Sequence, residues 1–442
     1  MTSILNWRPR TPFYYGWLIL AMAALGTLAA TGVSQVVLGG IQGFILEDME
    51  WDRSTIALAA LAGTWSSALL SPVVGRLADR YGPRWLMPFG LTVVGICLIG
   101  FSLCNSIWQF FIPYIVARGV SNPVLIGIVP RTAAVNFFRR KRNIALSLTG
   151  MSRPVTGAIN IQIISAFAVA YSWRTAYRYL GALSFFLILP LMVLMRRRPE
   201  DIGLLPDGAR PREIGEEPSP IDGHSGHRSA IGNRDQEFNW TAKEAFRTRA
   251  LWFVGICTAL GTMGGSSIGF SMVLYLQEEV GISKAQAAGV LSISTFMAIS
   301  NLGWGYLADR FTPRWCLIVA MVSASASVLY LLTVSSLPMA LVFGLVWGIF
   351  TGSIGVLEQM ILAQYFGRAS YGTISGTLSP LQTGALGLGP AMGALVRNAT
   401  GTYRWLNVIV AGSYLLAALL IFLARPPALP RRASTESPDR AD

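Results

Sequence analysis

The chain has 442 residues, of which 53% are hydrophobic and only 13% are charged, and its mean hydropathy is +0.51. A soluble core could not hide this much apolar surface, so the composition excludes a soluble globular protein and places the chain in a bilayer. The formal net charge of +13 would suit nucleic acid, but the basic residues fall in alternate loops, where membrane topology needs them. The sequence therefore predicts a multi-pass membrane protein that does not bind nucleic acid.

Apolar stretches long enough to cross a bilayer follow one another along the chain. A membrane-spanning helix needs about 20 mostly apolar residues, and twelve such stretches can be drawn. We therefore expect an all-α membrane protein with twelve transmembrane helices. The expected spans are 14–36, 54–74, 85–104, 107–130, 144–170, 174–195, 250–276, 285–307, 315–334, 337–365, 372–396 and 404–424.

The loop charges give the expected orientation. Basic clusters such as Arg139–Arg142 and Arg196–Arg198 fall in alternate loops, whereas the first loop on the opposite side contains the acidic stretch Glu47–Asp52. Because arginine-rich and lysine-rich loops stay in the cytoplasm, we expect both termini there. The preference for arginine over lysine suggests that the protein lies in a cell membrane, the bacterial inner membrane.

One fragment of the chain occurs twice. Gly75-Arg-Leu-Ala-Asp-Arg-Tyr-Gly-Pro-Arg-Trp85 follows the second span, and Gly305-Tyr-Leu-Ala-Asp-Arg-Phe-Thr-Pro-Arg-Trp315 follows the eighth. Ser172-Trp-Arg174 and Thr402-Tyr-Arg404 are displaced by the same interval. Duplication of one helix bundle explains both pairs, so we expect two pseudo-symmetric six-helix bundles.

The first copy of this fragment resembles the signature loop of the major facilitator superfamily, and its partial repeat fits that family's six-plus-six architecture. The resemblance implies a gating role, and physically an aspartate near a helix start can meet nearby arginines in a charge cluster that favours one position of the helices. Such a cluster has to break and form again as the two halves rock. The residues that this role concerns are Gly75, Asp79, Arg80, Gly82, Arg84, Gly305, Asp309 and Arg310.

Arg118 lies about eleven residues into the fourth span. A charge at mid-membrane costs a few kcal/mol, so it needs a partner, a watery cavity or a function. On a helix it shares a face with Tyr114 and Asn122 and points inward. Two interpretations stay open: Arg118 binds neighbouring carbonyls as a structural residue, or it contacts cargo or a coupled proton.

The junction of the fourth and fifth spans, Asn136-Phe-Phe-Arg-Arg-Lys-Arg-Asn-Ile-Ala145, resembles the entry to the fifth span in monocarboxylate and oxalate/formate-type transporters. This narrower resemblance implies a monocarboxylate substrate. Those carriers often use a lysine in the first span or an arginine in the eighth. The spans 14–36 and 285–307 contain neither, so the chain departs from that pattern.

Arg153 lies about nine residues into the fifth span, roughly 14 Å from its inner end at 1.5 Å per residue. Carriers of this kind hold their cargo near that depth. A guanidinium presents a planar fork of donors that matches a carboxylate, and Asn160 shares its face. Arg153 either binds an anionic cargo or pairs permanently with Glu358.

The sequence between the two predicted bundles changes to Pro, Gly, Asp, Glu and Arg, as is typical of a solvated connector. Its end, 240–247, is predicted to form a short helix on the inner surface. The expected organisation is an N-terminal six-helix bundle at 1–195, a cytoplasmic linker at 196–249, a C-terminal six-helix bundle at 250–424 and a cytoplasmic tail at 425–442.

Glu358 lies in the tenth span, where burial and a nearby arginine pull its protonation in opposite directions, so it can carry a proton. A structural acceptor near the inner mouth is the alternative. Two positive charges against one negative charge favour an organic anion as cargo. Gln35 and Gln382 are weaker candidates for polar contacts. The repeat is broken at all three charges, because Arg118, Arg153 and Glu358 correspond to Gly348, Thr383 and Ile128.

These features predict a secondary carrier that holds a small organic anion, in particular a monocarboxylate, between its bundles and works by alternating access, with proton symport through Glu358. An exporter of drugs or another metabolite is the alternative. An enzyme is not expected, because only two histidines occur, both in the connector, and no cluster of His, Asp and Ser appears. We expect no cofactor, no metal site and a functional monomer, with the anion, a proton and the lipid bilayer as partners.

Overall fold

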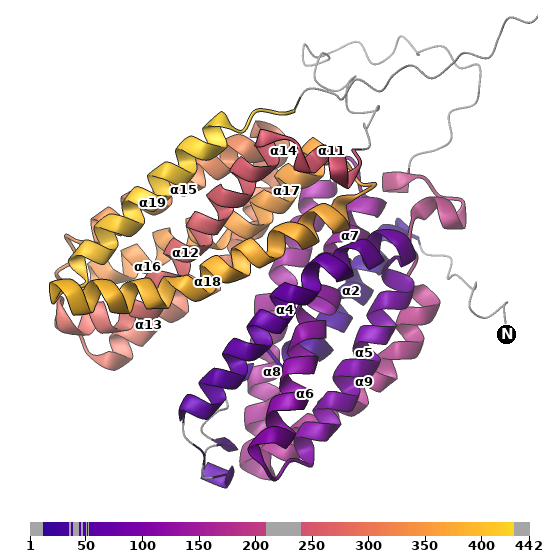
Figure 1. Ribbon diagram of the computed structural model, residues 1–442, viewed down its shortest axis with the longest axis horizontal. Helices are drawn as coiled ribbons and strands as arrows, with labels where there is room; N and C mark the ends of the chain where they lie inside the picture. The colour runs from indigo at the N-terminus through magenta and orange to yellow at the C-terminus, as the bar shows by residue number, and fades with distance from the viewer. Residues whose placement is uncertain are drawn as a thin grey trace, which may run out of the picture.

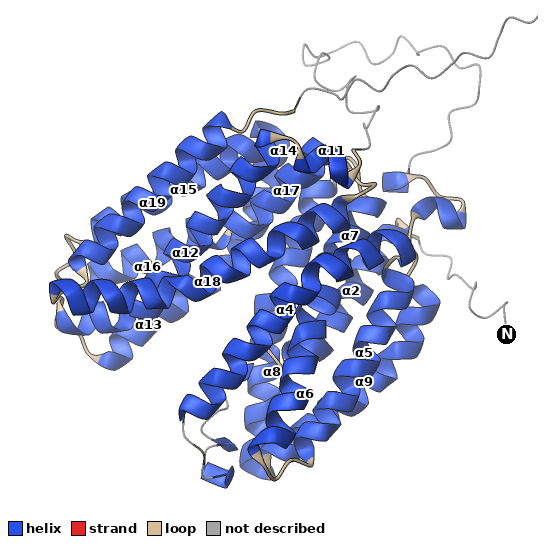
Figure 2. Cartoon of the chain, viewed as in Figure 1, coloured by secondary structure: helices blue, strands red, loops and turns tan. Residues whose placement is uncertain are grey.

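The computed structural model of the chain describes residues 12–34, 37–38, 44–45, 47–49, 51, 53–208 and 240–427. Within these ranges all regular secondary structure is helical (Figure 2). Eight helices are long and apolar enough to cross a membrane, and α2 is a shorter apolar helix. The predicted fold class, an all-α membrane protein of twelve helices, is confirmed.

Six crossings form the first bundle. The fourth crossing is composite, because a π-helical stretch, η1, joins two α-helices. Helix α4 runs on into the repeated fragment as far as Tyr81, well past the predicted end of its span at residue 74. The bounds are α2 (Tyr15–Thr31), α4 (Arg53–Tyr81), α5 (Pro83–Ser102), α6 (Ile107–Val120), η1 (Ser121–Ile126), α7 (Ile128–Phe137), α8 (Arg142–Ala170) and α9 (Trp173–Leu194).

The second bundle repeats this order after the linker. Two short helices begin the linker, η2 (Pro199–Ile202) and η3 (Pro206–Gly208), and α11 (Ala242–Phe246) is the helix expected at its end. Thr241 and Glu244 start α11 with a capping box. The other bounds are α12 (Arg249–Glu278), α13 (Lys284–Phe296), η6 (Met297–Ser300), α14 (Asn301–Phe311), α15 (Pro313–Leu331), α16 (Leu337–Gly352), α17 (Ile354–Phe366), α18 (Tyr371–Thr400) and α19 (Arg404–Leu423).

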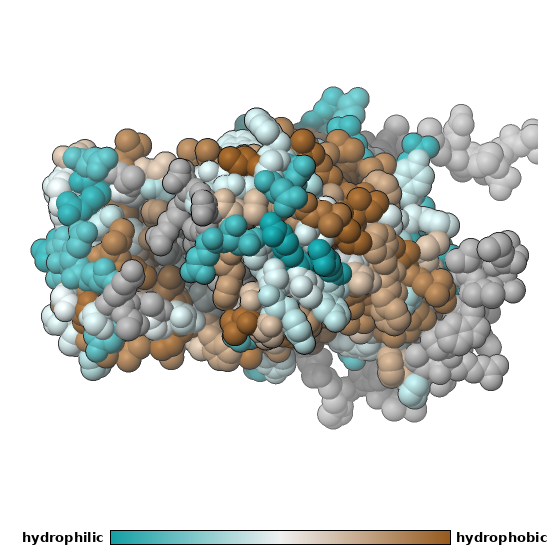
Figure 3. Space-filling view, turned by 90° about the horizontal axis from the view of Figure 1, so that it is seen from below, coloured by the Kyte–Doolittle hydropathy of each residue, from teal (hydrophilic) through white to brown (hydrophobic). Residues whose placement is uncertain are grey.

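Figure 1 shows the two bundles as the arms of a V. We call the end where α2 and α12 begin the linker side, and the opposite end the far side. The bundles meet at the linker side, around α7, α11 and α17, and their far-side helix ends diverge. Seen from below, hydrophilic surface gathers at the left end and in a band across the middle, with hydrophobic surface beside it (Figure 3).

Apolarity varies among the helices that pack across the two bundles. Helices α8 and α18 are long enough to span, but they are less apolar than the eight spanning helices. They are also helices that pack across the two bundles, α8 on α14 and α18 on α4. Outer helices meet only lipid and neighbours, so they can be uniformly apolar, and α19 is the most apolar of them.

Small residues allow close approach at both crossings between the bundles. A Cβ on Gly75 of α4 would collide with the carbonyl oxygen of Gly372 in α18. A Cβ on Gly305 of α14 would collide with the hydroxyl of Ser147 in α8. Because apolar surface alone drives no association in lipid, such contacts let dispersion and hydrogen bonds hold the helices together.

The two far-side ends repeat the same ion pair. Arg174, at the start of α9, binds the carboxylate of Asp48 at 2.8 Å. Arg404, at the start of α19, binds that of Glu279 at 3.4 Å. The second pair of fragments in the sequence therefore marks one tertiary contact that each bundle makes.

The fourth crossing differs from the continuous helix expected over 107–130. Gly127 donates its backbone N–H to the carbonyl of Asn122 at 2.8 Å, which is π-helical spacing, and Pro123 has no N–H to give. The hydroxyl of Thr27 in α2 donates to the carbonyl of Leu125 at 2.8 Å and so satisfies the opened turn. The crossing continues through α7 to Phe137.

Candidate functional site

The carboxylate of Asp79 caps a helix of the opposite bundle. It accepts the backbone N–H groups of Gly372 at 2.9 Å and Thr373 at 2.7 Å, and the Thr373 hydroxyl at 2.7 Å. These residues form the first turn of α18, where unpaired N–H groups and the helix dipole attract negative charge. Asp79 therefore ties the end of α4 to the start of α18 on the linker side.

The arginines of the fragment lie differently from the expected charge cluster. Within the described part of the chain, neither Arg80 nor Arg84 forms a salt bridge to Asp79, which is held by α18 instead. Arg80, Arg84 and Arg310 each lie over the ring of the following aromatic residue, 5.3, 5.9 and 5.9 Å from its centre. The guanidinium that reaches the loop is that of Arg197, which donates to the Asp79 carbonyl at 2.5 Å.

The second copy of the fragment makes a related contact, from the second bundle to the first. Asp309 of α14 accepts the side-chain amide of Asn143 in α8 at 2.8 Å. Each aspartate therefore reaches from its own bundle into the other. Gly82 of the first copy has a φ of +75°, and Thr312, at the same place in the second copy, has a φ of +72°.

Deeper in the first bundle, Arg118 is a buried cation that is short of partners. It is 3% exposed, and its Nε and Nη1 have no hydrogen-bond partner in the described structure. The hydroxyl of Tyr114, one turn earlier in α6, is equally unsatisfied. Gly63 of α4 makes room for both, because a Cβ there would lie 2.9 Å from each side chain. Unpaired buried donors cost about 1–3 kcal/mol each, which is typical of a place that receives a ligand or water.

Arg153 is exposed on α8, and its position on the helix indicates where it points. Leu148, Val155 and Ile159 are exposed apolar residues along one side of α8. Successive residues are about 100° apart, so Arg153 points about 120–160° away from them. The apolar side is the one suited to lipid, and Arg153 is therefore on a different face.

The neighbours of Arg153 along α8 belong to the inter-bundle contact. Gly150, one turn earlier, lies against Val356 of α17. Gly157, one turn later, has nothing within 4 Å of where a Cβ would be. The charge of Arg153 also interacts with those of Arg118 and Arg131 in its own bundle. Arg153 therefore lies beside open space next to the second bundle.

The carboxylate of Glu358 is buried in the second bundle, 1% exposed, on α17. Amides of Gln382 and Gln359 donate to its two oxygens, the latter at 3.5 Å, and the hydroxyl of Thr258 also bonds to it. Gln359 in turn accepts the hydroxyl of Tyr371 at 2.5 Å. The residues that satisfy Glu358 thus come from α12, α17 and α18 of its own bundle.

Arg131 is the functional candidate that the sequence analysis missed. It lies half-buried in α7, and its charge interacts with those of Glu358 and Arg153. Among the described residues, Arg153 forms no ion pair with Glu358. The predicted fourth span ended at residue 130, which made Arg131 a loop residue; the apolar run that continues to Phe138 was the available signal.

The predicted polar contacts separate into three groups. Asn160 is fully buried and donates to the carbonyl of Leu28 at 2.6 Å and to the hydroxyl of Thr31 at 2.7 Å, so its amide holds α8 against α2. Asn122 donates to Ser67 at 2.8 Å, within the first bundle. Gln382 contacts Glu358, whereas Gln35 lies outside the described residues.

A family model described as Major Facilitator Superfamily matches residues 23–267 and 251–441. The chain belongs to the major facilitator superfamily. A solved structure of another superfamily member, FucP in the outward conformation, is similar with a TM-score of 0.65 and 15% identity, over 92% of this chain and 98% of that one. At 15% identity, this structural similarity supports the fold alone.

Relatives within the superfamily carry several kinds of name. The chain is 22% identical over 425 residues to monocarboxylate transporter 4 of Rattus norvegicus, covering 92% of this chain and 83% of the relative. It is 27% identical over 411 residues to the 3-(3-hydroxy-phenyl)propionate transporter of Escherichia coli (strain K12), covering 90% and 89%. It is 23% identical over 413 residues to the membrane sensor protein UhpC of the same organism, covering 88% of each.

Membership settles the general class of this superfamily protein. It is a multi-pass membrane protein of a transporter family, and not an enzyme. The expected resemblance to the superfamily is thereby confirmed.

Proposed function

We propose that the protein carries a small organic anion, a monocarboxylate, across the membrane by alternating access, together with a proton. The anion binds between the bundles, against the first bundle, and Glu358 of the second bundle carries the proton. Both termini lie in the cytoplasm of a bacterial cell, and one chain suffices for transport. The linker side is then the cytoplasmic side.

The distribution of charge supports an anionic cargo. The charge of Arg153 interacts with those of Arg118 and Arg131. Glu358, whose charge interacts with that of Arg131, is already bonded by amides and a hydroxyl of its own bundle. Three guanidinium groups against one carboxyl leave the region cationic by about two charges. The single observation on which the proposal depends is the exposure of Arg153 on a face turned from lipid.

Two carboxylate transporters among the relatives support the choice of a monocarboxylate. Both relatives are named for substrates that bear one carboxylate. A planar carboxylate suits guanidinium donors in pairs, and Arg118 has two buried donors to offer. Proton symport follows if Arg131 can neutralise either Glu358 or the arriving anion but not both at once, so that binding of the anion favours protonation of Glu358.

Uptake of radiolabelled monocarboxylates into proteoliposomes tests this proposal. We expect Arg153→Gln to lower kcat/KM at least ten-fold, because a charge-assisted bond is worth about 1.5–3 kcal/mol. Glu358→Gln should abolish accumulation driven by a pH gradient while anion exchange persists. Arg247→Gln, which changes an exposed arginine between α11 and α12 on the linker side, serves as the matched control for loss of one positive charge.

Two results would overturn parts of the proposal. Unchanged kcat/KM in Arg153→Gln would remove Arg153 from the anion site, and a substrate profile dominated by organic cations would favour the drug-exporter alternative. Retained proton-driven accumulation in Glu358→Gln would remove the coupling role. Arg131→Gln tests the link between anion binding and proton coupling, because we expect it to weaken both anion affinity and the pH dependence of uptake.

A further inference from the structure

A hollow on the linker side of the first bundle gathers three arginines, and we call it the arginine hollow. It encloses about 470 Å³ between the end of α4, the start of α5 and the chain that follows α9. The residues that matter for its chemistry are Tyr81, Arg84, Trp85, Arg196, Arg197 and Asp201. It lies at the ends of membrane-spanning helices, the depth at which phospholipid headgroups are found.

We propose that the arginine hollow binds the phosphate-bearing headgroup of an anionic membrane phospholipid. The proposal concerns the surface of the protein and does not depend on the cargo proposed above. It rests on charge, on aromatic residues at the rim and on contrast with a second hollow.

The described residues that line the hollow carry a net positive charge. Three guanidinium groups lie beside one carboxylate, Asp201, which accepts the backbone N–H of Arg198 at 3.1 Å. Arg196 and Arg197 also donate to backbone carbonyls, which leave their positive charge in place. Arg196 is 3% exposed, and burial lowers the pKa of its guanidinium, with the nearby charge of Arg84 acting in the same direction. The phosphodiester of a headgroup carries one negative charge, which would offset part of this positive charge, and its oxygens can accept from the buried Nε of Arg84.

The rim of the hollow favours a lipid over a soluble phosphate. Trp85 and Tyr81 are 53% and 47% exposed at its edge. Tryptophan and tyrosine concentrate where headgroups meet acyl chains, because their rings are amphipathic. Basic pockets between helices on the cytoplasmic side are suited to anionic headgroups, and here the aromatic rings would flank the glycerol.

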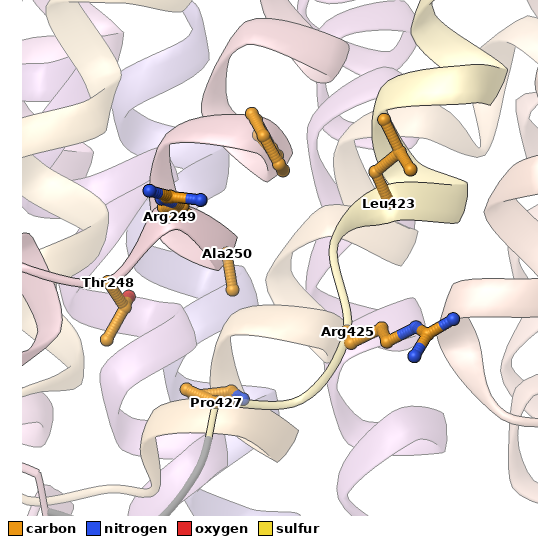
Figure 4. A pocket seen from close by; sticks show the side chains of 7 residues that line it. Thr248, Arg249, Ala250, Leu423, Arg425 and Pro427 are labelled. Atoms are coloured by element: carbon orange, nitrogen blue, oxygen red, sulfur yellow. The ribbon is translucent and has the colours of Figure 1, made fainter.

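A second hollow, in the other bundle, also contains arginines, but their guanidinium groups do not face a common point. It lies between the start of α12 and the end of α19 and contains Arg249 and Arg425. Figure 4 shows the Arg425 guanidinium pointing away from Arg249, so the two charges do not meet around one point. We therefore expect the lipid site in the first bundle alone. The hollow of the second bundle serves as a matched control within the same molecule.

Native mass spectrometry of the full-length protein in neutral detergent tests the proposal. We expect dioleoyl phosphatidylglycerol to bind at least ten-fold more tightly than dioleoyl phosphatidylcholine. The double variant Arg84→Gln/Arg197→Gln should lose this preference, and Arg249→Gln/Arg425→Gln should keep it. Equal binding of the two lipids by the wild type, or equal loss in both double variants, would overturn the proposal.

Two further experiments distinguish a lipid headgroup from free phosphate and provide a variant in which no arginine is changed. Inorganic phosphate at millimolar concentration should not displace phosphatidylglycerol; full displacement would identify a site for a free anion instead. Bromine-labelled phosphatidylglycerol should quench tryptophan fluorescence more in the wild type than in Trp85→Phe, in which all guanidinium groups are intact. Equal quenching would place the lipid elsewhere and contradict the proposal.

Discussion

Gly82 and Thr312 occupy the same place in the two repeats, and both have a positive φ. Glycine adopts this conformation without strain, whereas a β-branched residue does so at a cost of about 1–3 kcal/mol. In both copies the next residue is a proline that starts a helix, α5 or α15. The second repeat therefore kept the backbone turn after losing the residue best suited to it.

Replacing Thr312 by glycine should stabilise the protein. Relief of strain exceeds the entropic cost of a glycine in the unfolded chain, so we expect a gain of about 1 kcal/mol. The measurement is the thermal midpoint in detergent, which should rise by about 1 °C, because the entropy of unfolding grows with chain length. Gly82→Thr is the matched control and should lower the midpoint; a lower midpoint in Thr312→Gly would contradict the argument.

At one helix–helix contact, the large residue of the first bundle is replaced by a small residue in the second bundle. In the first bundle Arg118 lies against Gly63, whereas in the second bundle Gly348 occupies the place of Arg118 and lies against the backbone of Ser294. The sequence displays the exchange of arginine for glycine. Only the packing shows that the glycine has moved to the opposite helix, which is what gives Arg118 its space.

At the scale of elements, the crossing of α4 and α18 is a contact between the bundles on the linker side, and we expect closure of that side to depend on it. Asp79 caps α18, and the hydroxyls of Ser71 and Ser379 are 3.1 Å apart further along the crossing. A carboxylate at a helix N-terminus contributes about 0.3–2 kcal/mol, so its loss should open this contact without unfolding either bundle.

Asp79→Asn should therefore slow disulfide cross-linking between cysteines placed at Ser71 and Ser379. In a background without the four native cysteines, we expect the initial rate to fall about two- to thirty-fold, because the closed state becomes less populated. Asp309→Asn changes the repeat-related acid, which contacts α8 rather than α18. An equal fall in both variants would mean that Asp79 has no special role at this crossing.

At the scale of the molecule, the described hydrogen bonds between bundles gather on the linker side. Arg142 of the first bundle donates to the carbonyl of Ala363 at 2.9 Å, and Arg368 of the second donates to that of Asn136 at 3.2 Å. Arg368 also binds Glu200 at 2.6 Å. With the far-side helix ends diverging in Figure 1, the bundles are held at one end and apart at the other.

This arrangement predicts which side of the membrane reaches the centre. A cysteine in place of Gly157 enters open space and should react with a membrane-impermeant maleimide added from the far side. Ile159→Cys, on the apolar side of α8, should stay unlabelled because lipid covers it. Labelling is measured by mass shift, and the reverse pattern would mean that α8 turns its other face to the centre.

Sequence reasoning anticipated the helices and the repeat but not the arrangement of charge between them. Apolar runs and an exact sequence interval are local properties, so they identify α2 to α19 and the paired contacts of Arg174 and Arg404. Arg131 was missed because the fourth span was ended at the charge itself. Asp79 was expected to meet arginines of its own loop, yet its partner is a helix terminus nearly 300 residues away.

The sequence by itself determined that this chain lies in a membrane as two related bundles, because hydropathy and duplication can be read without knowing what touches what. The tertiary structure alone decided which polar groups lie near one another: Arg131 near Glu358, Arg118 beside Tyr114, and Arg153 on the face away from lipid. Electrostatic energy depends on separation and burial in space, and helix packing across the bundles sets both.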